Sequence, residues 1–275
     1  MTYLQAAILG VVQGVAEFLP ISSSGHLTLF QHFFGMEEPD SLYNILLHFA
    51  TLIAVCIYYW KDIWEMILEF FRGIASLGAP KGRHEAVPPA RRLVMLVIVG
   101  TLPLFLVLPI QDKVEALGAN PTVVSCILLV TGLILFAADR IARGGKDASN
   151  ATWMDALLVG VAQGLATLPG LSRSGSTIAA GMALGFDRKF AVRYSFLLSL
   201  PAVLGATLLK VLQVLGEGID TTLLPMYLAG MALSGVVGYF SIKLVNLLAD
   251  QKKFGAFAYY CWAAGILCLL NLHVF

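Results

Sequence analysis

The sequence predicts an all-α polytopic membrane protein, in which six transmembrane helices and two re-entrant broken helices form an inverted-topology repeat. The first observation behind this prediction is composition: 58% of the 275 residues are hydrophobic, 13% are charged, and the mean hydropathy is +0.81. A soluble domain carries about 25% charged residues, so most soluble classes are excluded. A net charge of +1 without long basic runs predicts no nucleic-acid partner. Apolar runs recur along the whole chain, so residues 1–275 are expected to form one membrane domain.

The apolar runs are the second observation, because six of them approach the roughly 20 residues that a helix needs to cross a bilayer. They are residues 44–60, 93–110, 122–138, 194–215, 224–248 and 257–275. Two further runs, 4–19 and 156–168, each lead into a proline and a small polar cluster, which is typical of broken helices. Residues 61–77 repeat apolar side chains at helical spacing, which predicts an interfacial helix or an extension of the first span.

Lysine and arginine are concentrated in alternate connections between these spans. The first-to-second, third-to-fourth and fifth-to-sixth connections are basic, whereas the two others contain Lys113 alone. Cytoplasmic connections of membrane proteins carry the excess of positive charge. The sequence therefore predicts three cytoplasmic connections and places both termini outside.

An internal repeat is the third observation. A shift of 150 residues aligns Gly10 with Gly160, Gln13 with Gln163, and Ser22-x-Ser24-Gly25 with Ser172-x-Ser174-Gly175. The repeats cover about residues 1–140 and about 151–275, and each has one broken helix followed by three spans. An odd number of crossings makes the second repeat enter the membrane from the opposite face, so the two broken helices are expected to meet near the midplane.

Serines open the second half of each broken helix, and serine is a favoured helix N-cap. Two helix N-termini with partial positive charge would then converge on one place, which predicts an anion site. The two halves bring different side chains to it: Glu17, Ser23 and His26 in the first, and Thr167, Arg173 and Ser176 in the second. This set suits phosphoryl chemistry: a hydroxyl or imidazole attacks, Arg173 holds phosphates, and Glu17 binds a divalent cation or takes a proton.

Structural interpretations of the same residues remain open. Glu17 and Arg173 could form an ion pair, the serines could act only as N-caps, and His26 could simply bind a backbone carbonyl. A structural role is favoured for Gln13 and Gln163, and a packing role is favoured for His48, although its side chain could instead face the cavity.

The two broken segments closely resemble the signatures of the bacterial undecaprenyl pyrophosphate phosphatases, a family also known from bacitracin resistance. The matching runs are Glu17-Phe18-Leu19-Pro20, Ser22-Ser23-Ser24-Gly25-His26 and Pro169-Gly170-Leu171-Ser172-Arg173-Ser174-Gly175. Gln13 stands where some members have an acid, and Ser24 replaces a threonine. Neither change removes a chemical group that the motif needs, although the first leaves metal binding more dependent on Glu17.

The resemblance implies a multi-pass enzyme of the bacterial plasma membrane that hydrolyses undecaprenyl pyrophosphate to undecaprenyl phosphate and inorganic phosphate. It implies recycling of the cell-wall carrier lipid, a need for Mg2+ or Ca2+, and a site that opens to the periplasm. Ser23 or His26 would be the nucleophile or base, Glu17 the metal or acid–base residue with Gln13 as a further ligand, and Arg173 the pyrophosphate clamp. Substrate binding is assigned to Ser22, Ser24, Gly25, Ser172, Ser174, Gly175 and Thr177.

A transporter or flippase of polyprenyl phosphate is the competing hypothesis, because inverted repeats are common in alternating-access transporters. The chemical inequality of the two halves favours the enzyme, since a carrier has less need of an acid and a histidine on one side only. Gly230, Gly235 and Gly238 in the fifth span permit close helix contact within the chain or between the subunits of a homodimer.

Overall fold

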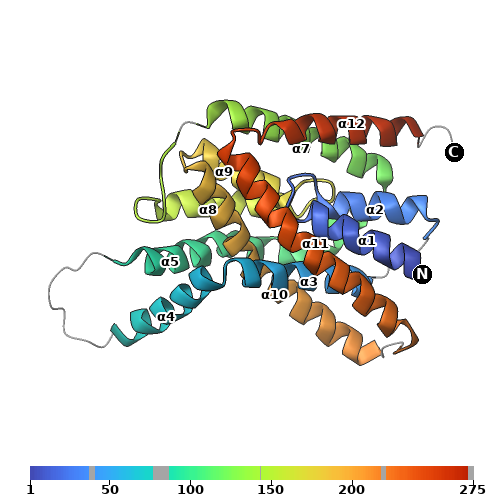
Figure 1. The fold of residues 1–275 in the computed structure, drawn as a ribbon, viewed down its shortest axis with the longest axis horizontal. Helices are drawn as coiled ribbons and strands as arrows, with labels where there is room; N and C mark the ends of the chain where they lie inside the picture. Colours follow the sequence, from blue (N-terminus) through green and yellow to red (C-terminus); the bar gives the residue numbers. More distant parts are fainter. Residues whose placement is uncertain (37–40, 77–86, 143, 218–220, 272–275) are drawn as a thin grey trace.

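The computed structural model describes residues 1–36, 41–76, 87–142, 144–217 and 221–271, and this part of the chain is helical apart from its connections and one isolated β-bridge between Lys146 and Phe186 (Figure 1). The α-helices are α1 (Tyr3–Ala16), α2 (Ser23–Phe33), α3 (Ser41–Tyr58), α4 (Trp60–Ser76), α5 (Pro89–Thr101), α6 (Gln111–Leu117), α7 (Pro121–Ile141), α8 (Trp153–Leu165), α9 (Arg173–Ala183), α10 (Arg188–Glu217), α11 (Leu224–Asp250) and α12 (Ala256–Asn271). Three 3-10 helices, η1 (Leu102–Leu106), η2 (Leu108–Ile110) and η3 (Thr221–Leu223), complete the set.

Every apolar stretch expected to span the membrane is helical where it is described. Four helical segments are long and apolar enough to cross a bilayer: Pro89–Val114, Pro121–Ile141, Arg188–Leu209 and Leu224–Asp250. A fifth candidate, α3 with α4, bends by 83° at its break, and the described part of α12 has 16 residues. The protein is therefore a helical polytopic membrane protein, and the count of six spans stays a prediction. The end of the sixth predicted span, residues 272–275, and the basic positions Lys81 and Arg83 lie outside the described residues.

The two broken segments approach the centre of the molecule from opposite ends. In Figure 1, α1 and α2 lie on the right and α8 and α9 lie on the left. The start of α1 and the end of α12 lie at the same end of the molecule. The location of both termini outside the membrane stays a prediction.

Equivalent caps begin the first helix of each broken segment. The Thr2 side chain accepts from the backbone N–H of Gln5, whose side chain accepts from the Thr2 N–H. Thr152 and Asp155, exactly 150 residues further on, make the same reciprocal pair at the start of α8. Such a capping box satisfies two backbone donors that the first helical turn leaves unpaired.

Glycines bring each of these helices against a span from the other half of the chain. A Cβ on Gly10 of α1 would lie 2.5 Å from the carbonyl oxygen of Gly230 in α11, and a Cβ on Gly160 of α8 would overlap the backbone of Gly100 in α5. Only residues without a side chain permit this approach. The two halves thus hold each other's broken helices, which ties the two breaks into one body.

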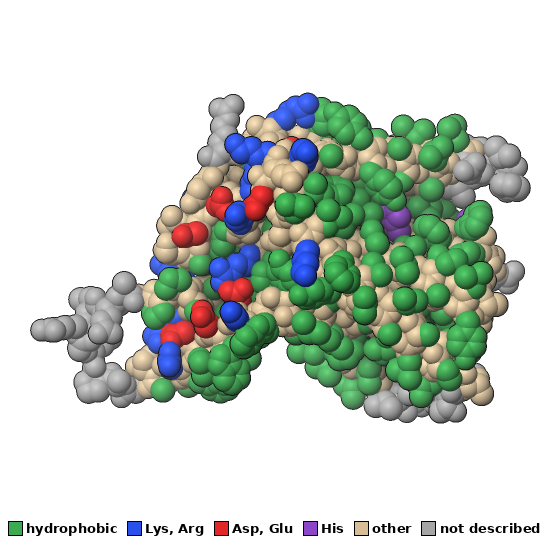
Figure 2. Space-filling view, viewed as in Figure 1, with side chains coloured by type: hydrophobic (Ala, Val, Ile, Leu, Met, Phe, Trp, Pro, Cys, Tyr) green, Lys and Arg blue, Asp and Glu red, His purple; other side chains and the backbone are tan. Residues whose placement is uncertain are grey.

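Charged side chains gather at one end of the molecule, around α4 and the start of α5, while most of the remaining visible surface is apolar (Figure 2). Several of them are paired between elements. Arg188 of α10 binds Asp139 of α7, Arg193 of α10 binds Asp62 of α4, and Arg91 Nη2 lies 3.0 Å from Glu69 Oε2. The described parts of the first-to-second and third-to-fourth connections therefore meet at a common polar end.

Candidate active site

Both broken helices stop four residues before a proline. α1 ends at Ala16, before Pro20, and α8 ends at Leu165, before Pro169. Proline disfavours helical backbone in the residue before it, so neither helix continues through the motif. The chain resumes as α2 and α9, which begin at Ser23 and Arg173.

Matched serines cap the new helices. Ser22 Oγ accepts from the Gly25 N–H at 3.3 Å, and Ser172 Oγ accepts from the Gly175 N–H at 3.0 Å. Ser22 has φ of +71°, whereas Ser172 has φ of −68°. The first break therefore holds a non-glycine residue in a strained backbone region, and such strain is typical of functional sites.

The two breaks are in direct contact. A Cβ on Gly25 would lie 3.1 Å from the Cα of Gly170, and a Cβ on Gly175 would lie 3.1 Å from the Pro20 Cβ. Thr131 of α7 donates to the Gly170 carbonyl at 2.9 Å, which anchors the second break to a span. The convergence expected from the repeat is thus present, and the two glycines serve the contact between the motifs.

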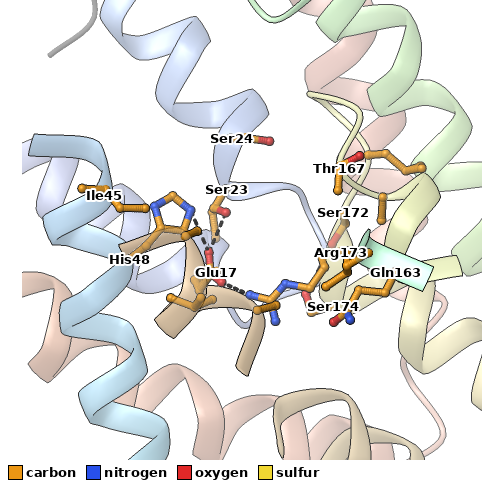
Figure 3. A pocket seen from close by; sticks show the side chains of 17 residues that line it. Glu17, Ser23, Ser24, Ile45, His48, Gln163, Thr167, Ser172, Arg173 and Ser174 are labelled. Atoms are coloured by element: carbon orange, nitrogen blue, oxygen red, sulfur yellow. Dashed lines mark hydrogen bonds and ion pairs between the residues drawn. The ribbon is translucent and has the colours of Figure 1, made fainter. Parts of the chain in front are cut away.

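A cavity of about 240 Å³ opens beside this contact. Figure 3 shows side chains from both motifs around it. Its polar lining comprises Glu17, Ser23, Ser24, His48, Gln163, Thr167, Ser172, Arg173 and Ser174, and apolar side chains such as Ile45 and Leu104 complete the wall.

Glu17 is buried at the centre of the polar network. Its Oε1 pairs with Arg173 Nη2, and its Oε2 accepts from Ser23 Oγ at 2.7 Å and from Gln13 Nε2 at 3.0 Å. The ion pair between Glu17 and Arg173, which the sequence left open as a structural interpretation, is therefore observed, and the Ser23 hydroxyl donates a hydrogen bond to the same carboxylate. A guanidinium has five N–H donors, so Arg173 can bind substrate oxygens while it holds Glu17.

The histidine on this cavity is His48, which the sequence had suggested was a packing residue. Its Nε2 lies 3.5 Å from Glu17 Oε2, and its Nδ1 lies 2.9 Å from the Asn44 carbonyl oxygen. A carbonyl only accepts, so Nδ1 carries a proton and Nε2 is the nitrogen that faces the carboxylate. No sequence motif marked His48, because it comes from α3, about 25 residues away from the serine run.

His26 is placed differently. Its Nδ1 lies 2.8 Å from the Ser22 carbonyl oxygen and its Nε2 lies 2.8 Å from Tyr260 Oη, on whose ring it stacks. By the same argument, Nδ1 donates and Nε2 accepts from the tyrosine hydroxyl. Both nitrogens are engaged, and the ring is absent from the cavity lining. The interpretation of His26 as a partner of a backbone carbonyl agrees with this arrangement, and its catalytic role stays a prediction.

The residues predicted to bind substrate divide into two groups. Ser24, Ser172 and Ser174 line the cavity. The other four are not among its lining residues: Ser22, Gly25, Gly175 and Thr177. Thr177 Oγ1 forms a hydrogen bond of 2.6 Å with the Ser195 hydroxyl, and this bond connects α9 to α10.

Gln163 lines the cavity although the repeat favoured a structural role for it. It is 1% exposed, and neither of its side-chain polar atoms has a hydrogen-bond partner. Its repeat equivalent Gln13 donates to Glu17, but the residue equivalent to Glu17 is Thr167, whose hydroxyl donates to the Gly164 carbonyl at 2.8 Å. The loss of the carboxylate therefore leaves the Gln163 amide unpaired beside the cavity.

The donors around the cavity suit an anionic ligand with several oxygens. One carboxylate with a bonded serine hydroxyl can activate a nucleophile, and Arg173 with two helix N-termini can balance negative charge. Among the described residues, no group of three or more His, Cys, Asp or Glu side chains could hold a metal ion by itself.

Fold and site together define a helical membrane protein with a polar, charged cavity between two broken helices. Residues 6–267 match the family described as bacitracin resistance protein BacA, so the chain belongs to that family. Proteins named undecaprenyl-diphosphatase are similar along nearly their whole length. The protein from Alkaliphilus metalliredigens is 40% identical, and the match covers 98% of this chain and 98% of the relative. The protein from Desulfatibacillum aliphaticivorans is 41% identical, and the match covers 98% of this chain and 99% of the relative. The relative from Halothermothrix orenii is 37% identical over 100% of both chains.

Proposed function

We propose that the protein is a membrane phosphatase that hydrolyses undecaprenyl pyrophosphate to undecaprenyl phosphate and inorganic phosphate. The observation that carries the proposal is the bonded set Ser23, Glu17 and Arg173, in which a hydroxyl, a carboxylate and a guanidinium meet beside one cavity. The family match and the names of the relatives support the same substrate. The product is the carrier lipid of cell-wall synthesis, and its recycling accounts for bacitracin resistance.

The geometry favours Ser23 as the nucleophile. Ser23 Oγ attacks the terminal phosphorus, and its proton passes to Glu17 Oε2, to which it is already bonded at 2.7 Å. The bond between that phosphorus and the bridging oxygen breaks, and undecaprenyl phosphate leaves with this oxygen and the proton from Glu17. Water then attacks the phosphoserine, and Glu17 transfers a water proton to the departing Ser23 oxygen.

Arg173 has two roles in this scheme. Its pairing with Glu17 orients the carboxylate, and its remaining N–H groups stabilise the charge that develops on the transferred phosphoryl group. The backbone N–H groups at the starts of α2 and α9 add to that stabilisation.

The residues present fit a divalent cation whose ligands come partly from the protein and partly from the substrate phosphates. Mg2+ is commonly bound by one or two carboxylates together with substrate phosphates. Glu17 would hold Mg2+ or Ca2+, with Gln13 as a further ligand, since the buried Gln13 Oε1 has no hydrogen-bond partner. The cation would neutralise phosphate charge.

For the membrane arrangement, we propose six spans and two re-entrant helices in an inverted repeat, with both termini and the site opening on the periplasmic side of the bacterial plasma membrane. The exchanged glycine contacts and the shared polar end support this arrangement.

Phosphate release from undecaprenyl pyrophosphate by the purified protein with Mg2+ tests the function. We expect Glu17→Gln, Ser23→Ala and Arg173→Ala each to lower kcat by about 100-fold or more, because each removes a group used in the transition state. EDTA should abolish release and Mg2+ should restore it. Glu65→Gln, on an exposed position of α4, is the matched control.

Unchanged turnover in all three site variants would overturn the proposal. Transport without hydrolysis, the competing hypothesis, would instead give lipid movement across vesicles with no phosphate release in the unmodified protein.

A further inference from the structure

A second cavity adjoins the active-site cavity. It has a volume of about 330 Å³ and lies between α10 on one side and η1, η2 and α6 on the other. The two cavities share four lining residues: Leu104, Thr167, Ala202 and Ala206. The second cavity is therefore a lateral continuation of the site, and we call it the α10 groove.

The α10 groove is mostly apolar and is lined by no charged residue. Phe105, Val107, Leu108 and Leu209 form much of its wall. The active-site cavity, by contrast, has Glu17 and Arg173 on its wall. The lining therefore changes from charged groups in the active-site cavity to apolar side chains in the α10 groove.

Three prolines and a glycine lie in the helical segments that form the wall of the α10 groove. The span that begins with α5 changes to 3-10 helix at Leu102, with Pro103 and Pro109 inside the 3-10 turns, and Pro201 lies within α10. A Cβ on Gly205 of α10 would meet no atom within 4 Å. There is therefore room beside Gly205 for a larger side chain.

We propose that the α10 groove holds the first isoprene units of the polyprenyl chain while the pyrophosphate occupies the active-site cavity. This inference rests on the proposed function. A polyprenyl pyrophosphate joins a polyanion to a long apolar chain, so the chain must leave the polar cavity through an apolar opening continuous with it. The α10 groove provides such an opening.

A groove of similar volume, about 340 Å³, provides the comparison. It lies between α7, α8 and α9 and is also apolar, but it shares only Leu171 with the active-site cavity. We call it the α9 groove. The two grooves are similar in volume and polarity, and the α10 groove differs from the α9 groove in sharing four lining residues with the active-site cavity.

Kinetics of variants that fill one groove at a time test the proposal. Gly205→Phe should raise KM for undecaprenyl pyrophosphate by about tenfold or more, because the ring would occupy the space of the isoprene units, and even one methylene in a hydrophobic pocket changes discrimination by about 10–200-fold. Gly205→Ala should behave as the unmodified protein, and Gly205→Leu should lie between them. Inhibition by inorganic pyrophosphate, which lacks the chain, should be unchanged in the whole series.

Ala183→Phe fills the α9 groove from an exposed position at the end of α9 and is the matched control. It should leave KM unchanged. An increase in KM for Ala183→Phe with none for Gly205→Phe would overturn the proposal.

Photolabelling of the unmodified protein gives an answer that does not depend on any variant folding. A polyprenyl pyrophosphate analogue with a diazirine on its first isoprene unit should label residues 101–114 and 201–209. Labelling confined to residues 134–141 and 179–183 would assign the chain to the α9 groove instead. Phosphate release by the unmodified protein is measured first. A lack of release would contradict the proposed function, whereas the labelling pattern decides between the two grooves.

Discussion

At the scale of single residues, the site depends on one carboxylate that organises its neighbours. Glu17 is buried, and its two oxygens are divided between a cation, Arg173, and the polar donors Ser23 and Gln13. A buried carboxylate without its partners would cost folding free energy. Each of these partners therefore stabilises the charge of Glu17 and fixes its position. The arrangement keeps the Ser23 hydroxyl oriented before substrate arrives.

His48 is predicted to contribute to turnover although it lies outside both motifs. His48→Gln should lower kcat/KM by about tenfold or more, because it removes the ring whose Nε2 lies 3.5 Å from Glu17 Oε2, and a histidine placed there can take part in general acid–base catalysis. His32→Gln, at an exposed position of α2, is the control and should have no effect. Equal activity of His48→Gln and the unmodified protein would exclude this contribution.

Ser22 is predicted to respond to substitution through its backbone as well as its hydroxyl. Ser22→Ala loses the N-cap bond to Gly25 and keeps the strained φ of +71°, whereas Ser22→Gly loses the bond but tolerates the angle. We expect the glycine variant to have a free energy of unfolding about 1 kcal/mol higher than the alanine variant. Unfolding in mixed micelles measures it, and the reverse order would contradict the strained turn.

At the scale of elements, close helix contact decides how the broken helices are held. α1 packs on α11 where Gly10 meets Gly230, and α8 packs on α5 where Gly160 meets Gly100. A membrane offers little hydrophobic driving force between helices, so close approach and van der Waals contact carry more of the association.

Two glycines of α11 are predicted to differ sharply. Gly230→Ala places a methyl group against the Tyr43 side chain and should lower the free energy of unfolding by about 1–3 kcal/mol. Gly235→Ala is the control in the same helix, since its nearest neighbour would be the Ala50 carbonyl oxygen at 3.4 Å. Thermal unfolding in detergent compares them, and equal stabilities would argue against the contact.

At the scale of the whole molecule, charge is expected to set the orientation. The ion-paired end around α4 and the start of α5 carries the basic connections, and the start of α1 and the end of α12 lie away from it. By the positive-inside rule, we predict that this end lies in the cytoplasm.

Epitope tags provide the measurement. Tags at either terminus of the full chain should be accessible to antibody in intact spheroplasts, whereas a tag inserted at the exposed residues 149–150 should require permeabilisation. Activity of each tagged protein shows that it has folded. External labelling at residues 149–150 would reverse the predicted topology.

Much of this protein could be predicted from local sequence. The low charge content and the apolar runs determined the helical membrane class, and the repeat with its serines and prolines determined where two helices break. Glu17 and Arg173 followed from the cost of placing charge at membrane depth, and the structure joins them as an ion pair. These features are set within single segments, where spacing and residue chemistry are enough.

Only the tertiary structure decided which residues face the site. His48 reaches Glu17 from α3, Gln163 becomes unpaired because Thr167 replaces a carboxylate, and His26 turns to Tyr260 of α12. The α10 groove likewise forms from two segments about 100 residues apart. The sequence by itself determined the chemistry available and where the chain breaks, but side-chain direction and cavity walls depend on how separate helices pack, which local spacing does not encode.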